Sequence, residues 1–305
     1  MSDLNKMHYE MLRIRMIEEE IARRYPEGKM RCPVHLSVGQ EAGAVGICAG
    51  LKPNDKMVST HRSHAHYLAK GGSLKALIGE LYGKVTGCAR GNGGSMHLID
   101  LSVNFYGSTS IVGGTIPIGV GIAFADKISG SDATTVICIG DAAVEEGVFH
   151  EAANFTALHK LKVIFAIENN HYSCYTYIHS RQPNRSSLKN IALAHDLVYV
   201  LCRPNDISSI NDEAVFTVFG KYPTLIEIPT YRHLQHCGPE NDDHLGYRPK
   251  GYMEYWRGLD PVKILDASWP AKIKQEIDEA FLDAENAPYP DPSEIGKYVY
   301  AHNNI

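Results

Sequence analysis

The sequence has 305 residues, of which 44% are hydrophobic and 21% are charged, and its formal net charge is −5. These values are typical of a globular protein with a substantial core, and they exclude a broad basic surface for nucleic acid or anionic membrane. No apolar run approaches the roughly 18 residues of a membrane-spanning helix, and the N-terminus lacks the apolar segment of a signal peptide. Seven cysteines without a CxxC pair are typical of reduced thiols, so we expect a cytoplasmic α/β protein.

The first predicted element is an amphipathic helix at about residues 8–25, because apolar residues recur there at helical spacing. The region from about residue 30 to residue 118 is rich in glycine and histidine. This composition predicts loops that approach a ligand closely.

From about residue 119 the pattern becomes regular. A helix of small residues (IGVGIAFADKI) precedes a strand (TTVICIG), and a helix (VEEGVFHEAANFTALHKL) precedes a second strand (KVIFAIENN). LVYVLC, a helix (ISSINDEAVFTVFGKY) and a strand (TLIEIPTY) follow. Strands that alternate with helices predict a doubly wound, mostly parallel sheet with right-handed crossovers.

The predicted helix that begins at Val144 should turn one face to this sheet. That face consists of Val144, Val148, Ala152 and Phe155. Beyond residue 232 we expect a loop dense in His, Asp and Gly, a charged helix near 271–285 and a proline-interrupted tail. We interpret residues 1–305 as one domain, with this C-terminal loop, helix and tail starting at about residue 233.

Polar residues follow two consecutive strands. Asp141 comes directly after TTVICIG, and Asn169, Asn170 and the backbone of Tyr172 come after KVIFAIENN. Consecutive strands of a βαβ unit commonly lie side by side, so these groups should meet at the edge where doubly wound sheets bind ligands. Carboxylate, amide and carbonyl oxygens suit Mg²⁺ or Ca²⁺, which would in turn hold a diphosphate. The alternative is that Asp141 caps a helix and the asparagines form a turn.

A dinucleotide site fits this sequence poorly. GDAAVEEG is not a GxGxxG motif, and its two glutamates would repel a bare pyrophosphate. GVGIAF is a weaker match, and a Walker loop is absent. A Rossmann-like nucleotide-binding module and a non-catalytic subunit remain as alternatives.

Gly140-Asp141, followed about thirty residues later by Asn169-Asn170, resembles the thiamine diphosphate motif. The run EGVFHEAANFTALHKLKVIFAIENNHY resembles the alpha subunits of the thiamine-dependent decarboxylating components of 2-oxo acid dehydrogenase complexes, such as the pyruvate, acetoin and branched-chain dehydrogenases. Further motifs agree in the same order: MLRIRMIEEEIA, HLSVGQEA, STHRSHAHYLAKG, ELYGKVTGCARGNGGSMHL, FYGSTSIVGGTIPIGVG and PTLIEIPTYR. The resemblance implies the diphosphate-binding half of the thiamine diphosphate-binding fold and an oxidoreductase of the acetyl-transferring type.

The resemblance also implies roles for single residues. Asp141, Asn170 and the carbonyl of Tyr172 match the family's Mg²⁺ ligands. The implied cofactor-binding residues are those three together with His61, Arg62, Ser110, Val112, Gly140, Ala142, Ala143 and His236. Of these, Arg62 is a diphosphate or substrate anchor, and Val112 wedges the cofactor into its bent shape.

Three histidines are implied as catalytic. His35 and His64 match pocket histidines that face the 2-oxo acid, and His236 matches a histidine on a mobile loop over the cofactor. In the mechanism that the resemblance implies, the thiazolium ring accepts the electrons released by decarboxylation, and histidines carry protons. A zinc cluster in HRSHAH is the weaker interpretation, because Arg62 in its midst would repel a cation.

Two departures from the family bear on function. The motif usually begins Gly-Asp-Gly, whereas this chain has Ala142. Relatives in the large complexes usually carry Gly-His-Ser where this chain has Gln235-His236-Cys237, followed by the acidic run PENDD. We expect an exposed loop there that becomes ordered when the cofactor binds.

The partners that the resemblance implies are a beta subunit, a 2-oxo acid substrate and, in the large complexes, a lipoyl acyltransferase. The beta subunit would supply the glutamate that activates the aminopyrimidine ring, in an α2β2 heterotetramer. The changed loop puts delivery to lipoamide in doubt. The alternative is a stand-alone carboligase that hands a two-carbon unit to a sugar or aldehyde.

Overall fold

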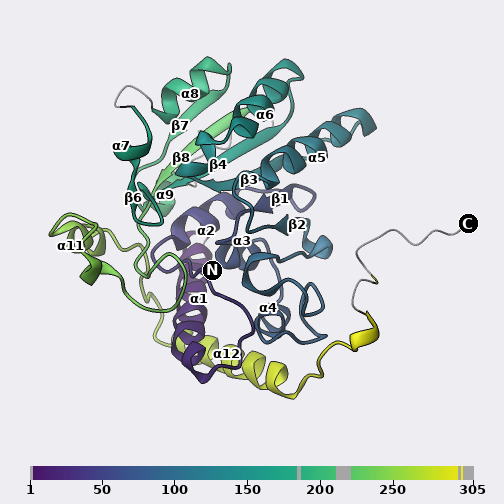
Figure 1. Ribbon diagram of the computed structural model, residues 1–305, viewed down its shortest axis with the longest axis vertical. Helices are drawn as coiled ribbons and strands as arrows, with labels where there is room; N and C mark the ends of the chain where they lie inside the picture. Colours follow the sequence, from purple (N-terminus) through teal and green to yellow (C-terminus); the bar gives the residue numbers. More distant parts are fainter. Residues whose placement is uncertain (1–2, 184–186, 211–220, 295–296, 298–305) are drawn as a thin grey trace, which may run out of the picture.

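A six-stranded sheet runs through the centre of the protein, whose computed structural model describes residues 3–183, 187–210, 221–294 and 297 (Figure 1). Its strands follow the order β2-β1-β3-β4-β8-β7, and each pairing among them is parallel. The predicted sheet is therefore confirmed. The strands are β1 (Lys56–Ser59), β2 (Phe105–Ser108), β3 (Thr135–Gly140), β4 (Val163–Asn169), β7 (Val198–Leu201) and β8 (Thr224–Pro229). A separate antiparallel pair consists of β5 (Tyr172–Ser173) and β6 (Thr176–Tyr177).

The central strands are apolar on both faces because helices cover both. In β3, Val136 and Cys138 belong to one hydrophobic core, whereas Ile137 and Ile139 belong to the other. This alternation follows from the two-residue period of a strand. It explains why TTVICIG is a continuous apolar run.

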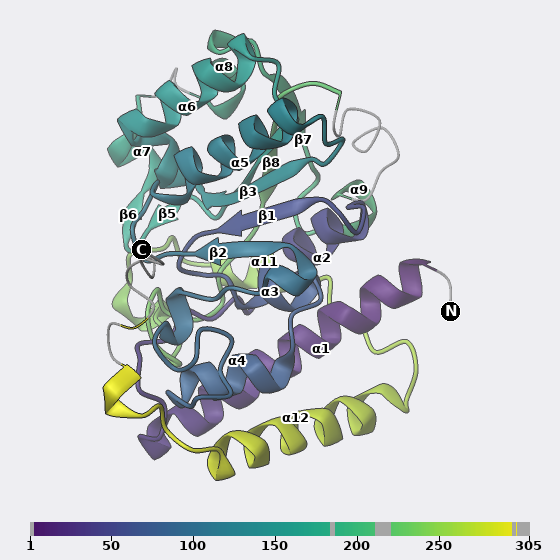
Figure 2. The ribbon, with the colours of Figure 1, turned by 90° about the vertical axis from the view of Figure 1, so that its right-hand side faces the viewer.

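Figure 2 shows the two helical layers on opposite sides of the sheet. One layer contains α5 (Thr115–Ser129), α6 (Gly147–Leu158) and α8 (Leu188–Ala194). The other contains α1 (Asp3–Arg24), α2 (Glu41–Ala49), α3 (His64–Ala69), α4 (Leu74–Leu81), α9 (Ile207–Ile210) and α12 (Trp269–Asn286). In this second layer α12 packs against α1 and α4, so the C-terminal helix covers the N-terminal one. Two further short helices are α7 (Ile178–Arg181) and α11 (Tyr252–Arg257).

Short 3-10 helices occupy several of the connections. They are Tyr25–Glu27, Gly94–Met96, Leu101–Val103, Asp141–Glu145, Asp243–Leu245 and Pro292–Glu294. Helix α5 ends at Gly130, whose φ of 74° allows its N–H to bond the carbonyls of Asp126 and Lys127. Among the residues described, no helix is both long and apolar enough to cross a membrane.

The prediction for residues 30–118 is incomplete. This region holds the strands β1 and β2 and the helices α2, α3 and α4, besides its loops. Both strands have four residues, too few to show a clear period. Helix α2 is buried along most of its length, so it lacks the polar face by which an amphipathic helix is recognised.

The predicted face of the helix after Asp141 is confirmed for Val144 and Ala152, which are buried in one core, but it is wrong for Phe155, and Val148 is only half-buried. The residues of α6 that are buried are Phe149, Ala152, Ala153 and Thr156, whereas Phe155 is 37% exposed. The cause is a break at Glu146, whose extended backbone (φ −72°, ψ 134°) separates the 3-10 turn from α6. Val144 is therefore not in phase with α6. Most of the helix predicted at 207–222 lies outside the described residues.

Candidate functional site

A cavity of about 200 Å³ lies at the carboxyl ends of β3 and β4. Its lining comes from segments that are distant in the sequence. All but two of the residues that the sequence predicted for the site line it: His35, His61, Arg62, Ser110, Val112, Gly140, Asp141, Ala142, Ala143, Asn170, Tyr172 and His236. The exceptions are His64 and Asn169.

Asp141 opens the 3-10 turn that follows β3 and is 2% exposed. Its Oδ2 accepts a hydrogen bond from the Arg181 guanidinium at 2.5 Å. Burial raises the pKa of Asp141, although the Arg181 charge acts in the opposite direction. Arg181 also forms an ion pair with Glu145, so one cation bridges two carboxylates of this turn.

The two asparagines after β4 point in different directions. Asn170 lines the cavity, and its Oδ1 accepts a hydrogen bond of 3.0 Å from the Tyr172 N–H. Asn169 does not line the cavity, because its Nδ2 donates to Glu227 of β8 at 2.8 Å. The expectation that both asparagines serve the site is therefore wrong for Asn169.

The donors around this part of the cavity are hard oxygens. They are the carboxylate of Asp141, the side-chain oxygen of Asn170 and the backbone of Tyr172. Arg181 bonds one carboxylate oxygen of Asp141 and leaves the other for an ion. Such a set fits Mg²⁺, which is usually held by one or two carboxylates together with the phosphates of its ligand. Small residues at Gly140, Ala142 and Ala143 leave room beside it.

Three histidines form another part of the lining. The ring centroids of His35 and His61 are 4.8 Å apart, and each is 5.2 Å or less from the His236 ring. Burial, and then the charge of Arg62, lower the pKa of His35 to about 2, of His61 to about 4 and of His236 to about 3. All three imidazoles are thus neutral at neutral pH.

Arg62 lines the same cavity and is 5% exposed. Its guanidinium donates to the carbonyl oxygens of Leu36, at 2.6 Å, and His236, at 2.9 Å. Burial and the neighbouring Arg232 lower the pKa of Arg62 to about 9, so it keeps its charge at neutral pH. The site therefore presents one fixed cation beside three neutral bases.

The depressed pKa values make stability depend on pH. The folded chain keeps these imidazoles neutral, whereas the unfolded chain protonates them below about pH 6.5. Their contribution is therefore present above that pH and is lost as the pH falls toward the folded values. We expect His236→Asn to reduce the slope of unfolding free energy against pH by up to about 1.4 kcal/mol per unit between about pH 6 and about pH 4.5.

Urea unfolding at a series of pH values would measure this slope. The exposed His244 provides the control, as His244→Asn. An unchanged slope for His236→Asn would show that its imidazole is protonated in the folded chain as well.

His64 lies behind the cavity wall and is fully buried. Its Nδ1 is 3.2 Å from Glu18, and its Nε2 is hydrogen-bonded to the Ser95 hydroxyl at 2.8 Å. The same hydroxyl accepts a bond of 3.4 Å from the backbone N–H of His35. The structure thus places His64 as a support for the His35 segment, and its predicted contact with substrate is not supported by its position.

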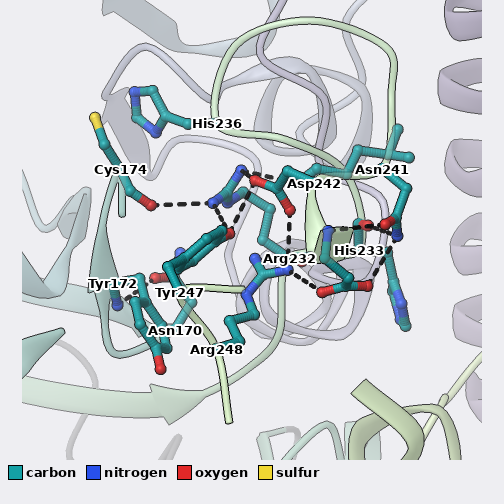
Figure 3. A network of polar contacts seen from close by, with 12 residues as sticks. Asn170, Tyr172, Cys174, Arg232, His233, His236, Asn241, Asp242, Tyr247 and Arg248 are labelled. Carbon is teal, nitrogen blue, oxygen red and sulfur yellow. Dashed lines mark hydrogen bonds and ion pairs between the residues drawn. The ribbon is translucent and has the colours of Figure 1, made fainter. Parts of the chain in front are cut away.

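The loop that carries His236 is fixed by a buried ion network. The guanidinium of Arg232 is 3.3 Å from Asp242 and donates to the Cys174 carbonyl at 3.2 Å, as Figure 3 shows. Arg248 pairs with the other oxygen of Asp242 at 3.1 Å. The network joins the base of the His236 loop to the segment that follows Tyr172.

The prediction of an exposed acidic loop is wrong for Asp242, which is 1% exposed. Its two arginine partners compensate its buried charge. Glu240 and Asn241 are exposed, as expected.

Several lining residues escaped the sequence prediction. Glu168 is 6% exposed, and its carboxylate lies 3.3 Å from Gln40 Nε2 and 3.4 Å from His66 Nε2. A charged residue at the end of an apolar strand was the available signal for Glu168. Cys174 also lines the cavity. Arg181 does not line the cavity but bonds Asp141 from the end of α7, a four-residue helix too short to be predicted from a sequence pattern.

Arg181 offers a direct test of the turn. Arg181→Met should lower the free energy of unfolding by about 1–2 kcal/mol, because it leaves the buried Asp141 carboxylate without its cation. Arg203→Met is the matched control: Arg203 pairs with Asp206 at the surface, so about 0.5 kcal/mol or less is expected. Urea unfolding would measure both. Equal losses would mean that the Arg181 pair is no stronger than a surface pair.

Comparison with known proteins gives a consistent result. The family model of the dehydrogenase E1 component matches residues 9–293. The alpha subunit of the pyruvate dehydrogenase E1 component from Rickettsia bellii is 32% identical, over 97% of this chain and 95% of the relative. The alpha subunit of acetoin:2,6-dichlorophenolindophenol oxidoreductase from Bacillus subtilis is 33% identical, over 96% of this chain and 92% of the relative.

Solved structures show the same fold at lower identity. Transketolase from Campylobacter jejuni superimposes with a TM-score of 0.60 at 16% identity, and a transketolase mutant from Pichia stipitis does so with a TM-score of 0.59 at 18% identity. These matches cover 92% and 93% of this chain but only 47% and 45% of the transketolase chains. A family model that spans most of the sequence, and relatives more than 30% identical along nearly their whole length, establish that the chain belongs to the dehydrogenase E1 component family.

Proposed function

We propose that this chain is the alpha subunit of a thiamine diphosphate- and Mg²⁺-dependent 2-oxo acid dehydrogenase. It would act in the decarboxylation of a pyruvate-like 2-oxo acid and the transfer of the resulting acyl unit. The observation that carries the proposal is the meeting of Asp141, Asn170 and Tyr172 with three neutral histidines in one cavity. Family membership and the relatives named above support it.

The cofactor would be held through its diphosphate. Asp141, Asn170 and the Tyr172 carbonyl would bind the metal, and the small residues of the turn from Gly140 to Ala143 would let the phosphates approach. The cofactor, when bound, supplies an electron sink for decarboxylation. Ala142 replaces the motif glycine without a strained backbone, because it lies in a 3-10 turn and its φ is not positive.

The side chains on the other side would bind the substrate and move protons. Arg62 keeps a positive charge at neutral pH, which attracts the carboxylate of a 2-oxo acid. His35 Nδ1 is buried and has no hydrogen-bond partner among the described residues, so it is free to bond a substrate oxygen. His236 would exchange a proton with the reacting group.

The cavity would be completed by a beta subunit. Ser110 and Val112 line it and are exposed, and Ile111 between them is 69% exposed. This apolar rim supports an interface there, and we propose an α2β2 heterotetramer. A beta subunit would bring the glutamate for the aminopyrimidine ring. A cytoplasmic location is part of the proposal and is supported by composition alone.

The acceptor of the acyl unit is a lipoyl group on an acyltransferase, or else a sugar or aldehyde. Gln235-His236-Cys237 replaces the Gly-His-Ser that relatives in the large complexes usually carry, and this change is the reason to test a sugar or aldehyde acceptor beside the lipoyl group. Turnover by the chain co-purified with its beta subunit, with pyruvate and either acceptor, would distinguish them.

Thermal unfolding with added ligands tests the proposal itself. Thiamine diphosphate with Mg²⁺ should raise the midpoint, because a ligand of the native state stabilises it by mass action. Thiamine diphosphate with a chelator should raise it less, and NAD should leave it unchanged. A shift with NAD, or none with thiamine diphosphate and Mg²⁺ in the presence of the beta subunit, would contradict the proposal.

A further inference from the structure

The fold brings together three histidines from distant segments. His35 precedes α2, His61 follows β1, and His236 lies in the loop after β8. One ring nitrogen from each lies within 4.8 Å of the others. Within the described part of the chain, this is the one group of three or more His, Cys, Asp or Glu side chains close enough to share an ion.

The free nitrogens favour a ligand over a hydrogen-bonded core cluster. His35 is 6% exposed, yet its Nδ1 is buried without a hydrogen-bond partner in the described structure. Buried polar groups normally have partners, so an unpartnered ring nitrogen beside two other imidazoles favours a bound group. His61 Nδ1 is hydrogen-bonded to the Thr60 hydroxyl at 3.0 Å, which leaves its Nε2 available. Such a bond also fixes the ring, as in histidines that bind metals.

Three imidazoles suit a particular class of cation. Nitrogen ligands bind Zn²⁺, Co²⁺ and similar transition-metal ions, whereas Mg²⁺ and Ca²⁺ require oxygen. Three histidines with an open fourth position form a known zinc arrangement.

Arg62 opposes such an ion, since its buried guanidinium lies close to the cluster. Two of its donors, however, bond the carbonyl oxygens of Leu36 and His236, so these two point away from the ring nitrogens. A hydroxide or carboxylate as fourth ligand would offset the added charge. Arg62 therefore lowers the affinity of the site for a metal ion and favours a metal ion whose fourth ligand is an anion.

We propose that His35, His61 and His236 form a second metal site in the cavity, selective for Zn²⁺ or a similar transition-metal ion and separate from the oxygen site at Asp141. An ion there holds the three imidazoles and blocks the substrate side of the cavity. The inference rests on the positions of the three rings and does not require the proposed function.

Cobalt titration of the full chain tests the site. Co²⁺ is added without cofactor and under saturating Mg²⁺, so that the oxygen site is occupied, and its visible absorption reports coordination. The variant is His61→Tyr, which keeps an aromatic ring but removes a nitrogen ligand. His236→Gln, in the loop, is the second variant and decides the outcome if His61→Tyr does not fold by circular dichroism.

An adventitious site must be separated from this one. His150 Nδ1 and His195 Nε2 are 2.9 Å apart and could hold an ion between them. His150→Asn is therefore the matched control. The exposed Cys174 and Cys237 are a second source of ligands, which a thiolate-to-cobalt charge-transfer band would reveal.

The expected result is one Co²⁺ per chain with the intense absorption of a four-coordinate ion, competed by Zn²⁺. His61→Tyr should weaken Co²⁺ binding at least about tenfold, because even the loss of a residue that hydrogen-bonds a metal ligand costs about that much. His150→Asn should leave Co²⁺ binding unchanged. Equal affinity in wild type and His61→Tyr, loss of binding in His150→Asn, or a thiolate band would overturn the site. Calorimetry on the same samples would measure the binding of thiamine diphosphate with Mg²⁺. A failure of the three-histidine site can then be distinguished from a failure of the proposed function.

Discussion

Replacing Asp141 by alanine is expected to abolish Mg²⁺-dependent binding of thiamine diphosphate, with affinity reduced more than about 100-fold. Asp141 is the charged member of the oxygen set, and loss of a metal's outer partners alone costs about 10–100-fold. Asp141 is 2% exposed and lines the cavity, so a carboxylate on the protein surface cannot take its place as a metal ligand. Isothermal titration calorimetry with the beta subunit present would measure the affinity.

The fold should survive this substitution. Arg181 would keep Glu145 as an ion-pair partner after losing Asp141. Asn169→Ala is the matched control, because Asn169 stands beside Asn170 but faces Glu227. We expect that variant to bind the cofactor about as well as wild type. If Asp141→Ala bound it as tightly as wild type, the oxygen site would not be the metal site.

Replacing His236 by alanine is expected to cut acyl transfer by about 10²-fold or more while largely sparing cofactor affinity. A positioned acid–base group contributes about that factor. His236 lines the cavity, and its ring is 5.2 Å from those of His35 and His61. Asn or Gln at this position should rescue little, because they donate hydrogen bonds but do not carry a proton.

The measurement is the rate of acyl transfer at saturating cofactor and Mg²⁺, with the beta subunit present and transition metals removed by a chelator selective over Mg²⁺. Removal of such metals prevents occupation of the three-histidine site. His244→Asn, on the exposed part of the same loop, controls for loop disturbance and should leave the rate unchanged. A rate for His236→Ala close to that of wild type would remove this residue from the mechanism.

The meeting of Asp141 with Asn170 and Tyr172 in one cavity was predictable because it depends on strand adjacency. A short helical crossover brings consecutive parallel strands together, so β3 and β4 pair in register and the residues after them share an edge. Gly140 of β3 pairs with Glu168 of β4, which places Asp141 beside the start of the Asn169–Asn170 pair. The motif and the topology therefore support each other.

Side-chain direction was harder to predict. Asn169 and Asn170 are equivalent as residue types, yet successive residues of an extended chain point to opposite sides, so one faces Glu227 and the other the cavity. His64 and His66 are likewise buried at the start of a helix, where pairing with Glu18 and Glu168 fixes them. Resemblance gave position in the chain but not orientation.

The sequence also could not predict that His35, His61 and His236 lie close together. Each was predicted for the site separately, but no spacing rule relates residues from three loops. Their distances depend on how those loops are held, including the bond from Arg62 to the His236 carbonyl.

The buried ion network of Arg232, Asp242 and Arg248 affects which parts of the His236 loop can differ between related proteins. It fixes the loop at its two ends, whereas the tip is held by backbone bonds, from Gly238 N–H to the Val34 carbonyl at 2.8 Å and from Gln235 N–H to the Glu240 carbonyl at 2.7 Å. Bonds of this kind do not depend on side-chain identity. Tip residues other than Gly238, whose φ is 120°, and the proposed proton carrier His236 can therefore be replaced without refolding of the frame. Substitutions at the tip could therefore change which acyl acceptor the protein uses, while the residues that would bind the cofactor stay the same.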